Sequence, residues 1–135
     1  MIGLLLASHG ELCKGIENSL NLVMGEQENV ITLPLYSDSN IDEYSMELER
    51  KIDELNDGDG VIVMVDLLGG SPCNRVSRLV QSKKIKVLTG MNLPMVFSFV
   101  EARLQGMNLD DAAAHCLKFS KEGIYDLASF INVNQ

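Results

Sequence analysis

The sequence predicts one α/β domain, residues 1–135, on a doubly wound, mostly parallel sheet of order 2-1-3-4 with helices on both faces. Two observations favour this fold class. Short apolar runs alternate with amphipathic helical patterns along the chain, and the runs at 2–7 and 61–65 contain no polar side chain, as expected of strands covered on both faces. The connections between such parallel strands are expected to be right-handed crossovers.

The first half of the chain supplies two strands and two helices. The run at 2–7 is followed by an amphipathic pattern over 11–24, which Gly25 ends as a C-cap. Residues 29–34 form the second strand. Asn40, with a glutamate three residues later, resembles a capping box and starts the next helix, whose two faces are apolar and charged.

The strand at 61–65 is the most apolar, which places it at the centre of the sheet. Ser71 is predicted to cap a helix that begins at Pro72 and continues to the lysines at 83–84. Its inward-facing residues are predicted to be Cys73, Val76, Leu79 and Val80. A short strand at 85–88 follows.

The last third is predicted to be mainly helical. Residues 95–105 form an apolar helix, and Asn108 caps another that ends before Gly123. The pattern over 124–133 fits either a last helix or an edge strand, and both interpretations stay open.

Composition narrows the function classes. The net charge of −8 argues against nucleic acid and against an anionic membrane surface, because there is no basic stripe to contact phosphates. The three cysteines show no metal-ligand spacing and indicate reduced packing thiols in the cytoplasm. The sequence contains neither a Walker loop nor a GxGxxG motif. No metal and no cofactor are predicted.

Three loops of unusual composition are predicted at the carboxyl edge of the sheet, where ligands bind in such folds. They are Ser8-His9-Gly10, residues 66–71, and residues 90–94 with Asn92. His9 could be a nucleophile that accepts a phosphoryl group on one ring nitrogen. Asp66 could hold the other ring nitrogen and so fix the tautomer.

The turn after Asp66 could receive the phosphoryl oxygens. Gly69 and Gly70 allow close approach of backbone N–H groups, and Ser71 adds a hydroxyl donor. Each residue also has a structural explanation: a strand-end histidine, a turn aspartate and a capping serine. Their convergence on one edge favours a site. His115, in the middle of a predicted helix, is interpreted as either structural or exposed.

Four motifs, in order, resemble a known family. They are Ser-His-Gly at 8–10, Gly-Glu followed by Asn-Val at 25–30, Asp-x-x-Gly-Gly-Ser-Pro-x-Asn at 66–74, and Gly-x-Asn-Leu-Pro-Met at 90–95. Together they look like the IIA component of the mannose-type (mannose, fructose, sorbose) sugar phosphotransferase system. The resemblance covers about residues 2–105.

The resemblance implies a phosphotransferase component that acts as a phosphoryl carrier. It would accept the group from the histidine phosphocarrier protein (HPr) on His9 at Nε2 and pass it to the IIB component, which acts with the membrane components IIC and IID. Asp66 matches the residue that pairs with His9, and Ser71, with Gly69 and Gly70, matches the phosphate-stabilising turn. The family is typically a homodimer with an exchanged, antiparallel C-terminal edge strand, which would fall at 123–129.

The sequence departs from the family at Leu68 and Cys73, where aromatic residues are common. No IIB domain or linker follows, which predicts a stand-alone IIA protein. The acidic balance predicts steering toward a partner with a basic face. Two alternatives stay open: the phosphocarrier subunit of a phosphotransferase-dependent dihydroxyacetone kinase, and a non-catalytic regulatory module on the same fold.

Overall fold

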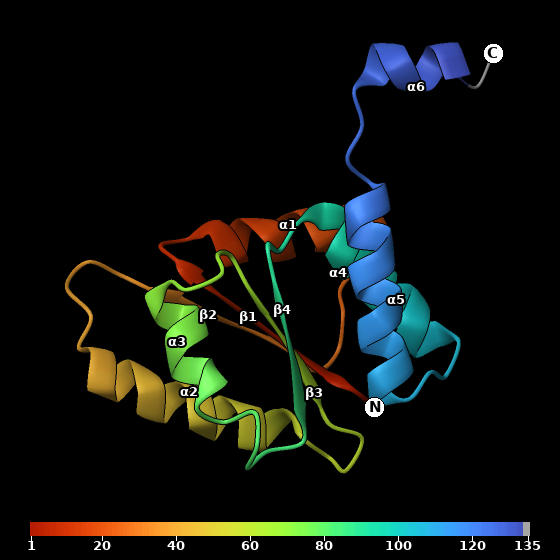
Figure 1. Ribbon diagram of the computed structural model, residues 1–135. Helices are drawn as coiled ribbons and strands as arrows, with labels where there is room; N and C mark the ends of the chain where they lie inside the picture. The colour runs from red at the N-terminus through yellow and green to blue at the C-terminus, as the bar shows by residue number, and fades with distance from the viewer. Residues whose placement is uncertain (134–135) are drawn as a thin grey trace.

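Four parallel strands form the sheet in the computed structural model, which describes residues 1–133, in the predicted order β2-β1-β3-β4 (Figure 1). The register aligns Ala7 of β1 with Val65 of β3, and His9 with Leu35 of β2. The carboxyl ends of the two central strands therefore lie side by side. The strands are β1 (Gly3–His9), β2 (Val30–Leu35), β3 (Val61–Val65) and β4 (Ile85–Thr89).

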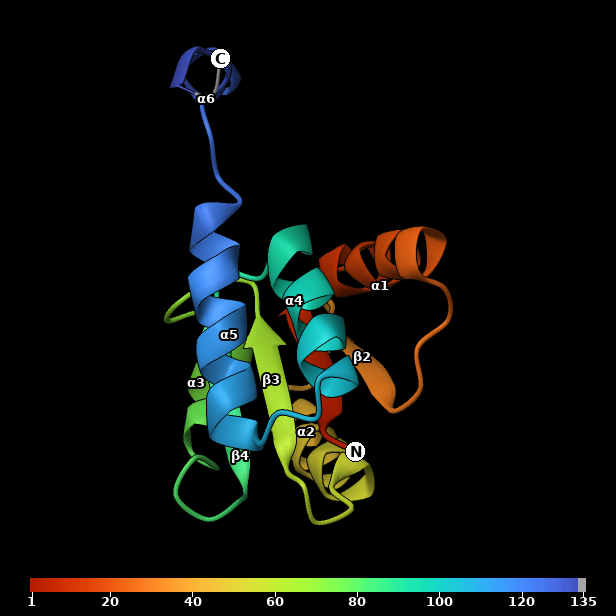
Figure 2. The ribbon, with the colours of Figure 1, turned by 90° about the vertical axis from the view of Figure 1, so that its right-hand side faces the viewer.

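Helices cover both faces of this sheet (Figures 1 and 2). One face packs against α1, α4 and α5, and the other packs against α2 and α3. Within the described residues the helices are α1 (Leu12–Met24), α2 (Ile41–Leu55), α3 (Ser71–Ser77), α4 (Leu93–Leu104), α5 (Leu109–Glu122) and α6 (Leu127–Val133). None of these helices is long and apolar enough to cross a membrane.

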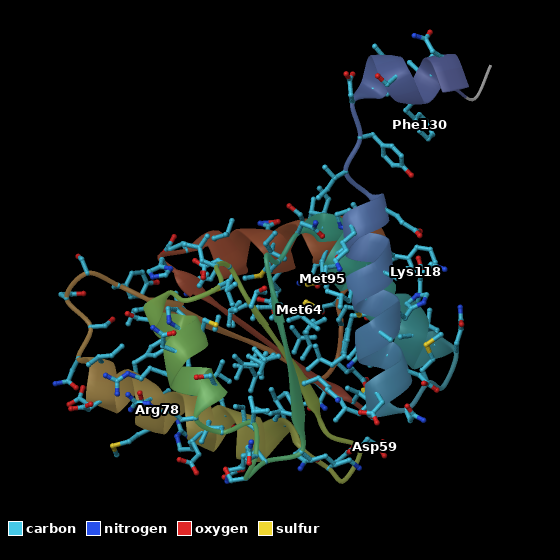
Figure 3. The ribbon with its side chains drawn as sticks, in the orientation of Figure 1. Asp59, Met64, Arg78, Met95, Lys118 and Phe130 are labelled. Carbon is cyan, nitrogen blue, oxygen red and sulfur yellow. The ribbon has the colours of Figure 1, made fainter. Side chains whose placement is uncertain are left out.

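Cover on both faces of the sheet explains why residues 3–7 of β1 and all of β3 are apolar. In β1, Leu4 and Leu6 belong to the core under α1, α4 and α5, whereas Leu5 belongs to the core under α2 and α3. Met64 of β3 and Met95 of α4 meet in the first of these cores (Figure 3). Each fully buried side chain of this size stabilises the fold by about 1.5–3 kcal/mol.

Side-chain caps fix the starts of α2 and α5 as the sequence predicts. Asn40 Oδ1 accepts the backbone N–H groups of Asp42 and Glu43, each at 3.0 Å. Asn108 Oδ1 accepts the N–H of Asp111 at 2.9 Å. Each bond satisfies a donor that the first turn of a helix leaves without a partner.

The helix after β3 differs from its prediction. Gly70, not Ser71, is the N-cap of α3, and no side chain caps it. The helix ends at Ser77, where the Ser77 hydroxyl donates to the Asn74 carbonyl at 2.7 Å. Turns over residues 78–82 replace the rest of the predicted helix, and Val80, predicted to face inward, is exposed.

The strand predicted over 123–129 is wrong for the chain described. Residues 127–133 form α6, which stands away from the rest of the domain (Figure 2). An isolated strand has no partner for its backbone groups, whereas a helix satisfies them internally. Asp126 starts this helix, since its Oδ1 accepts the N–H of Ala128 at 3.1 Å. The helix that the pattern over 124–133 left open is the one observed.

Candidate functional site

The structure brings His9 and Asp66 together at the carboxyl edge of the sheet. His9 is the last residue of β1, and Asp66 follows the last residue of the neighbouring β3. The ring Nδ1 of His9 lies 2.8 Å from Asp66 Oδ2, which also accepts the backbone N–H of His9 at 2.9 Å. The N–H of Leu67 donates to Asp66 Oδ1 at 3.0 Å. Asp66 thus holds both the backbone and the ring of His9.

The two side chains differ in exposure. The Asp66 side chain is 9% exposed, whereas that of His9 is 46% exposed. Burial raises the pKa of the Asp66 carboxyl, but the hydrogen bonds from the backbone and ring of His9 outweigh it, and the pKa lies below its ordinary value. Asp66 is therefore an ionised acceptor at neutral pH, which favours a proton on Nδ1 and a lone pair on Nε2 of His9.

Gly70 closes the space beside the imidazole. A Cβ at Gly70 would lie 2.6 Å from His9 Cε1 and 3.3 Å from Nε2, so no larger residue fits without moving the ring. The loop is held from α3, because Asn74 Nδ2 donates to the Gly69 carbonyl (3.0 Å) and Asn74 N–H donates to the Gly70 carbonyl (2.8 Å). Gly69 has φ +84°, a conformation that strains other residues. Ser71 is exposed at the start of α3.

Ser8 and Gly10 flank His9, and their hydrogen bonds hold the backbone of the turn that follows β1. The buried Ser8 hydroxyl accepts the N–H of Cys13 at 2.9 Å and donates to the Gly10 carbonyl at 3.0 Å. Gly10 has φ +59°, and its N–H donates to the Leu35 carbonyl at 2.7 Å. These bonds fix the turn from β1 into α1, and with it the direction in which His9 leaves the strand.

Asn92 and His115 have packing partners of their own. Asn92 Oδ1 caps α4 by accepting the N–H of Met95 at 2.9 Å, and its Nδ2 donates to the Ser120 carbonyl at 3.2 Å. His115, on α5, is largely buried, with its ring 4.6 Å from that of Phe119. His115 belongs to the helical layer, in agreement with its structural interpretation.

No site role is predicted from the sequence for Leu67 or Tyr36, and Leu68 is noted there only as a departure from the family; all three follow strands at this edge of the sheet. Leu67 and Leu68 are exposed beside Asp66, and Tyr36, at the end of β2, donates its hydroxyl to Glu11 Oε1 at 3.1 Å. The sequence does contain a signal for the two leucines. Apolar residues continue beyond the end of β3 at Val65 and are interrupted only by Asp66.

A match to a protein-family model decides the family. Residues 3–117 match the EIIA-man model, described as the PTS system fructose IIA component. The chain belongs to this family.

Named relatives and solved structures agree with this IIA assignment. The mannose-specific EIIAB component of Escherichia coli (strain K12) is 28% identical over 124 residues, which are 91% of this chain but 38% of that protein's length. The crystal structure of EIIA from Streptococcus agalactiae has a TM-score of 0.87 and 34% identity, covering 96% of this chain and 99% of that one. The IIA protein associated with the fucose utilization operon of Streptococcus pneumoniae has a TM-score of 0.82 and 28% identity, covering 96% and 95%.

Proposed function

We propose that this IIA protein is a cytoplasmic phosphoryl carrier of a sugar phosphotransferase system, with the group held on Nε2 of His9. The observation that carries this proposal is the 2.8 Å contact between His9 Nδ1 and Asp66 Oδ2 on a ring that is half-exposed. With Nδ1 held by Asp66, Nε2 is the nitrogen that keeps a lone pair, on a side chain that is 46% exposed. Family membership supports the same function.

In the transfer step, the Nε2 lone pair attacks the phosphorus of a phosphohistidine on the donor. A new N–P bond forms on His9, the N–P bond of the donor breaks, and its electron pair returns to the donor's ring nitrogen. Positive charge develops on the His9 ring, where the Asp66 carboxylate stabilises it. Transfer to the next protein is the same step in reverse, so His9 supplies a covalent intermediate.

The phosphoryl oxygens are placed against the turn at 69–71. The close approach of Gly70 to the His9 ring supports this placement, because the backbone of that turn is then beside the modified nitrogen. Ser71, exposed and next in the chain, offers its hydroxyl as a further donor. Such stabilisation and positioning are the main requirements of phosphoryl transfer.

HPr is the proposed donor and a IIB component the proposed acceptor, which in turn serves membrane components IIC and IID. The resemblance of the site motifs to mannose-type IIA components supports these partners, and the E. coli relative is named as a joined EIIAB component. The chain covers 38% of that relative's length, so a IIB partner corresponds to a part of the relative that this chain does not match.

We also propose that two copies of this chain form a homodimer through the C-terminal arm, residues 124–133. Ile124, Tyr125 and Leu127 are exposed apolar residues within four positions, on a segment that stands off the domain (Figure 3). A seven-residue helix is too short to be stable alone in water, so packing on a second copy would stabilise it. Sedimentation of the full chain should give a dimer, and a chain ending at Gly123 should give a monomer.

The decisive experiment uses phosphoenolpyruvate, enzyme I and HPr. Acid-labile phosphate should label the wild-type protein, the label should be absent from His9→Ala, and it should remain in His115→Ala, the variant of the second histidine of the chain. Labelling that persists in His9→Ala would overturn the assignment. Transfer to a dihydroxyacetone kinase instead of IIB would favour the kinase-subunit alternative. Absence of labelling in the wild type would favour the regulatory alternative.

A further inference from the structure

The loop between β3 and α3 contacts His9 at two points and is held from α3 at a third. Asp66, at its start, binds the ring and the backbone of His9, and Gly70, at its end, lies against the ring. Between these two contacts, Asn74 Nδ2 donates to the Gly69 carbonyl at 3.0 Å. Within the part of the chain that the structure describes, this is the only hydrogen bond from outside the loop to the backbone of residues 67–69.

The peptide group between Gly69 and Gly70 could turn over at little steric cost. Gly69 has φ +84°, and neither residue has a Cβ that would hinder rotation of the peptide that joins them. In a trans peptide the carbonyl and the N–H point in opposite directions. The bond from Asn74 therefore fixes both groups, because the Gly69 carbonyl faces α3 and the Gly70 N–H points away from it.

The Gly70 N–H is a donor that no described residue accepts. A backbone N–H without a protein partner is left to bind water or a ligand. This donor belongs to a residue in contact with the imidazole, since a Cβ at Gly70 would lie 2.6 Å from His9 Cε1. If the peptide turned over, the Gly69 carbonyl oxygen would take the place of the N–H and would repel an anion. The orientation of this peptide therefore decides whether the loop attracts or repels a phosphoryl group on His9.

We infer that Asn74 is a positioning residue for phosphoryl transfer. It holds the Gly69–Gly70 peptide so that the Gly70 N–H, and not the Gly69 carbonyl, faces the phosphoryl oxygens on His9. This inference rests on the proposed function. Asn74 acts through the peptide that it holds, and a donor fixed in place before the charge arrives stabilises a transferring anion better than one that must first reorient.

The first measurement follows the Gly70 amide by NMR. Phosphorylation of His9 through phosphoenolpyruvate, enzyme I and HPr should move the Gly70 amide proton downfield in the wild type, because the N–H gains an anionic acceptor. The shift should be smaller in Asn74→Ala, in which alanine preserves the helix but not the bond to Gly69. Asn108→Ala is the matched control. It also loses one side-chain bond to the backbone, and Asn108 lies near Met1 at the opposite end of the sheet, so its Gly70 shift should equal that of the wild type.

The second measurement is the rate of His9 labelling by phosphoramidate, a small donor that needs no protein partner. In Asn74→Ala this rate should fall about three- to tenfold, the effect of one lost hydrogen bond, whereas in Asn108→Ala it should stay within about twofold of wild type. A Gly70 amide that does not move when His9 is phosphorylated, or equal labelling rates in the two variants, would overturn the role of Asn74 while the phosphoryl-carrier function stood. Failure of both donors to label His9 in the wild type would instead overturn the proposed function.

Discussion

Asp66→Asn is the substitution that most directly probes the geometry around His9. Asp66 accepts the ring Nδ1–H and the backbone N–H of His9 and the N–H of Leu67. Asparagine preserves the size of the side chain but removes its charge. A hydrogen bond to a charged group is worth about 1.5–3 kcal/mol, and about 1.4 kcal/mol corresponds to a factor of ten in rate. The bond reaches this strength when positive charge develops on the ring during transfer. Its loss should therefore slow transfer about 10- to 150-fold.

Rapid-quench labelling by phosphorylated HPr would measure this rate. Asp111→Asn provides the control, since it removes one exposed carboxylate at the start of α5 and should transfer at the wild-type rate. A rate for Asp66→Asn within twofold of wild type would show that the carboxylate does not stabilise the modified ring, and the argument from the His9–Asp66 contact would fail.

The same variant has a second consequence for stability. The pKa of Asp66 is lowered in the folded protein, so its stabilising contribution is complete above the unfolded value of about 3.9 and is lost as pH falls through the folded pKa. The free energy of unfolding of Asp66→Asn should therefore lie furthest below wild type at pH 7 and approach it below about pH 4. Urea titrations at pH 7 and pH 3 measure this, and a constant difference would contradict it.

Three further substitutions test neighbouring parts of the edge. Gly70→Ala would place a methyl group 2.6 Å from His9 Cε1, so labelling should fall severalfold and the ring's NMR signals should shift. Ser8→Ala would leave the buried N–H of Cys13 without its acceptor and should lower the free energy of unfolding by about 1–3 kcal/mol, measured in urea. Asn92→Ala would remove the α4 cap, which costs about 1 kcal/mol of stability, while phosphoramidate labelling of His9 stays within twofold.

The sheet and its strand order could be predicted because they depend on local patterns in the sequence. Apolar runs covered on both faces, separated by helical periodicity, leave few topologies once crossovers are right-handed. The same reasoning places the ends of β1 and β3 together, and so places His9 beside Asp66. Their separation of 57 positions was no obstacle, because strand register, not sequence distance, decides which loops meet.

Other features depend on competition that a sequence pattern does not resolve. At Gly70-Ser71-Pro72, serine is the better capping residue, yet the backbone of Gly70 takes the cap position. The tail beyond Gly123 has both helical and strand character, and the choice depends on whether a sheet edge is available to pair with it.

The two leucines after Asp66 show the same difficulty for burial. Leu67 and Leu68 continue the apolar run of β3 without a break other than Asp66, so hydrophobicity alone would count them toward the core. The strand ends at Val65, and the two leucines are exposed. Only the position of this strand end distinguishes a core residue from a surface residue here.

The arrangement of His9 also indicates where the rate of transfer is decided. One carboxylate oxygen accepts from both the backbone and the ring of His9, and Gly70 lies against the ring from the following loop. The imidazole is thereby oriented before any partner arrives, so little reorganisation within this chain is left for the transfer step. For the proposed carrier, the part of the step that this arrangement does not fix is the approach of the donor's phosphoryl group to Nε2.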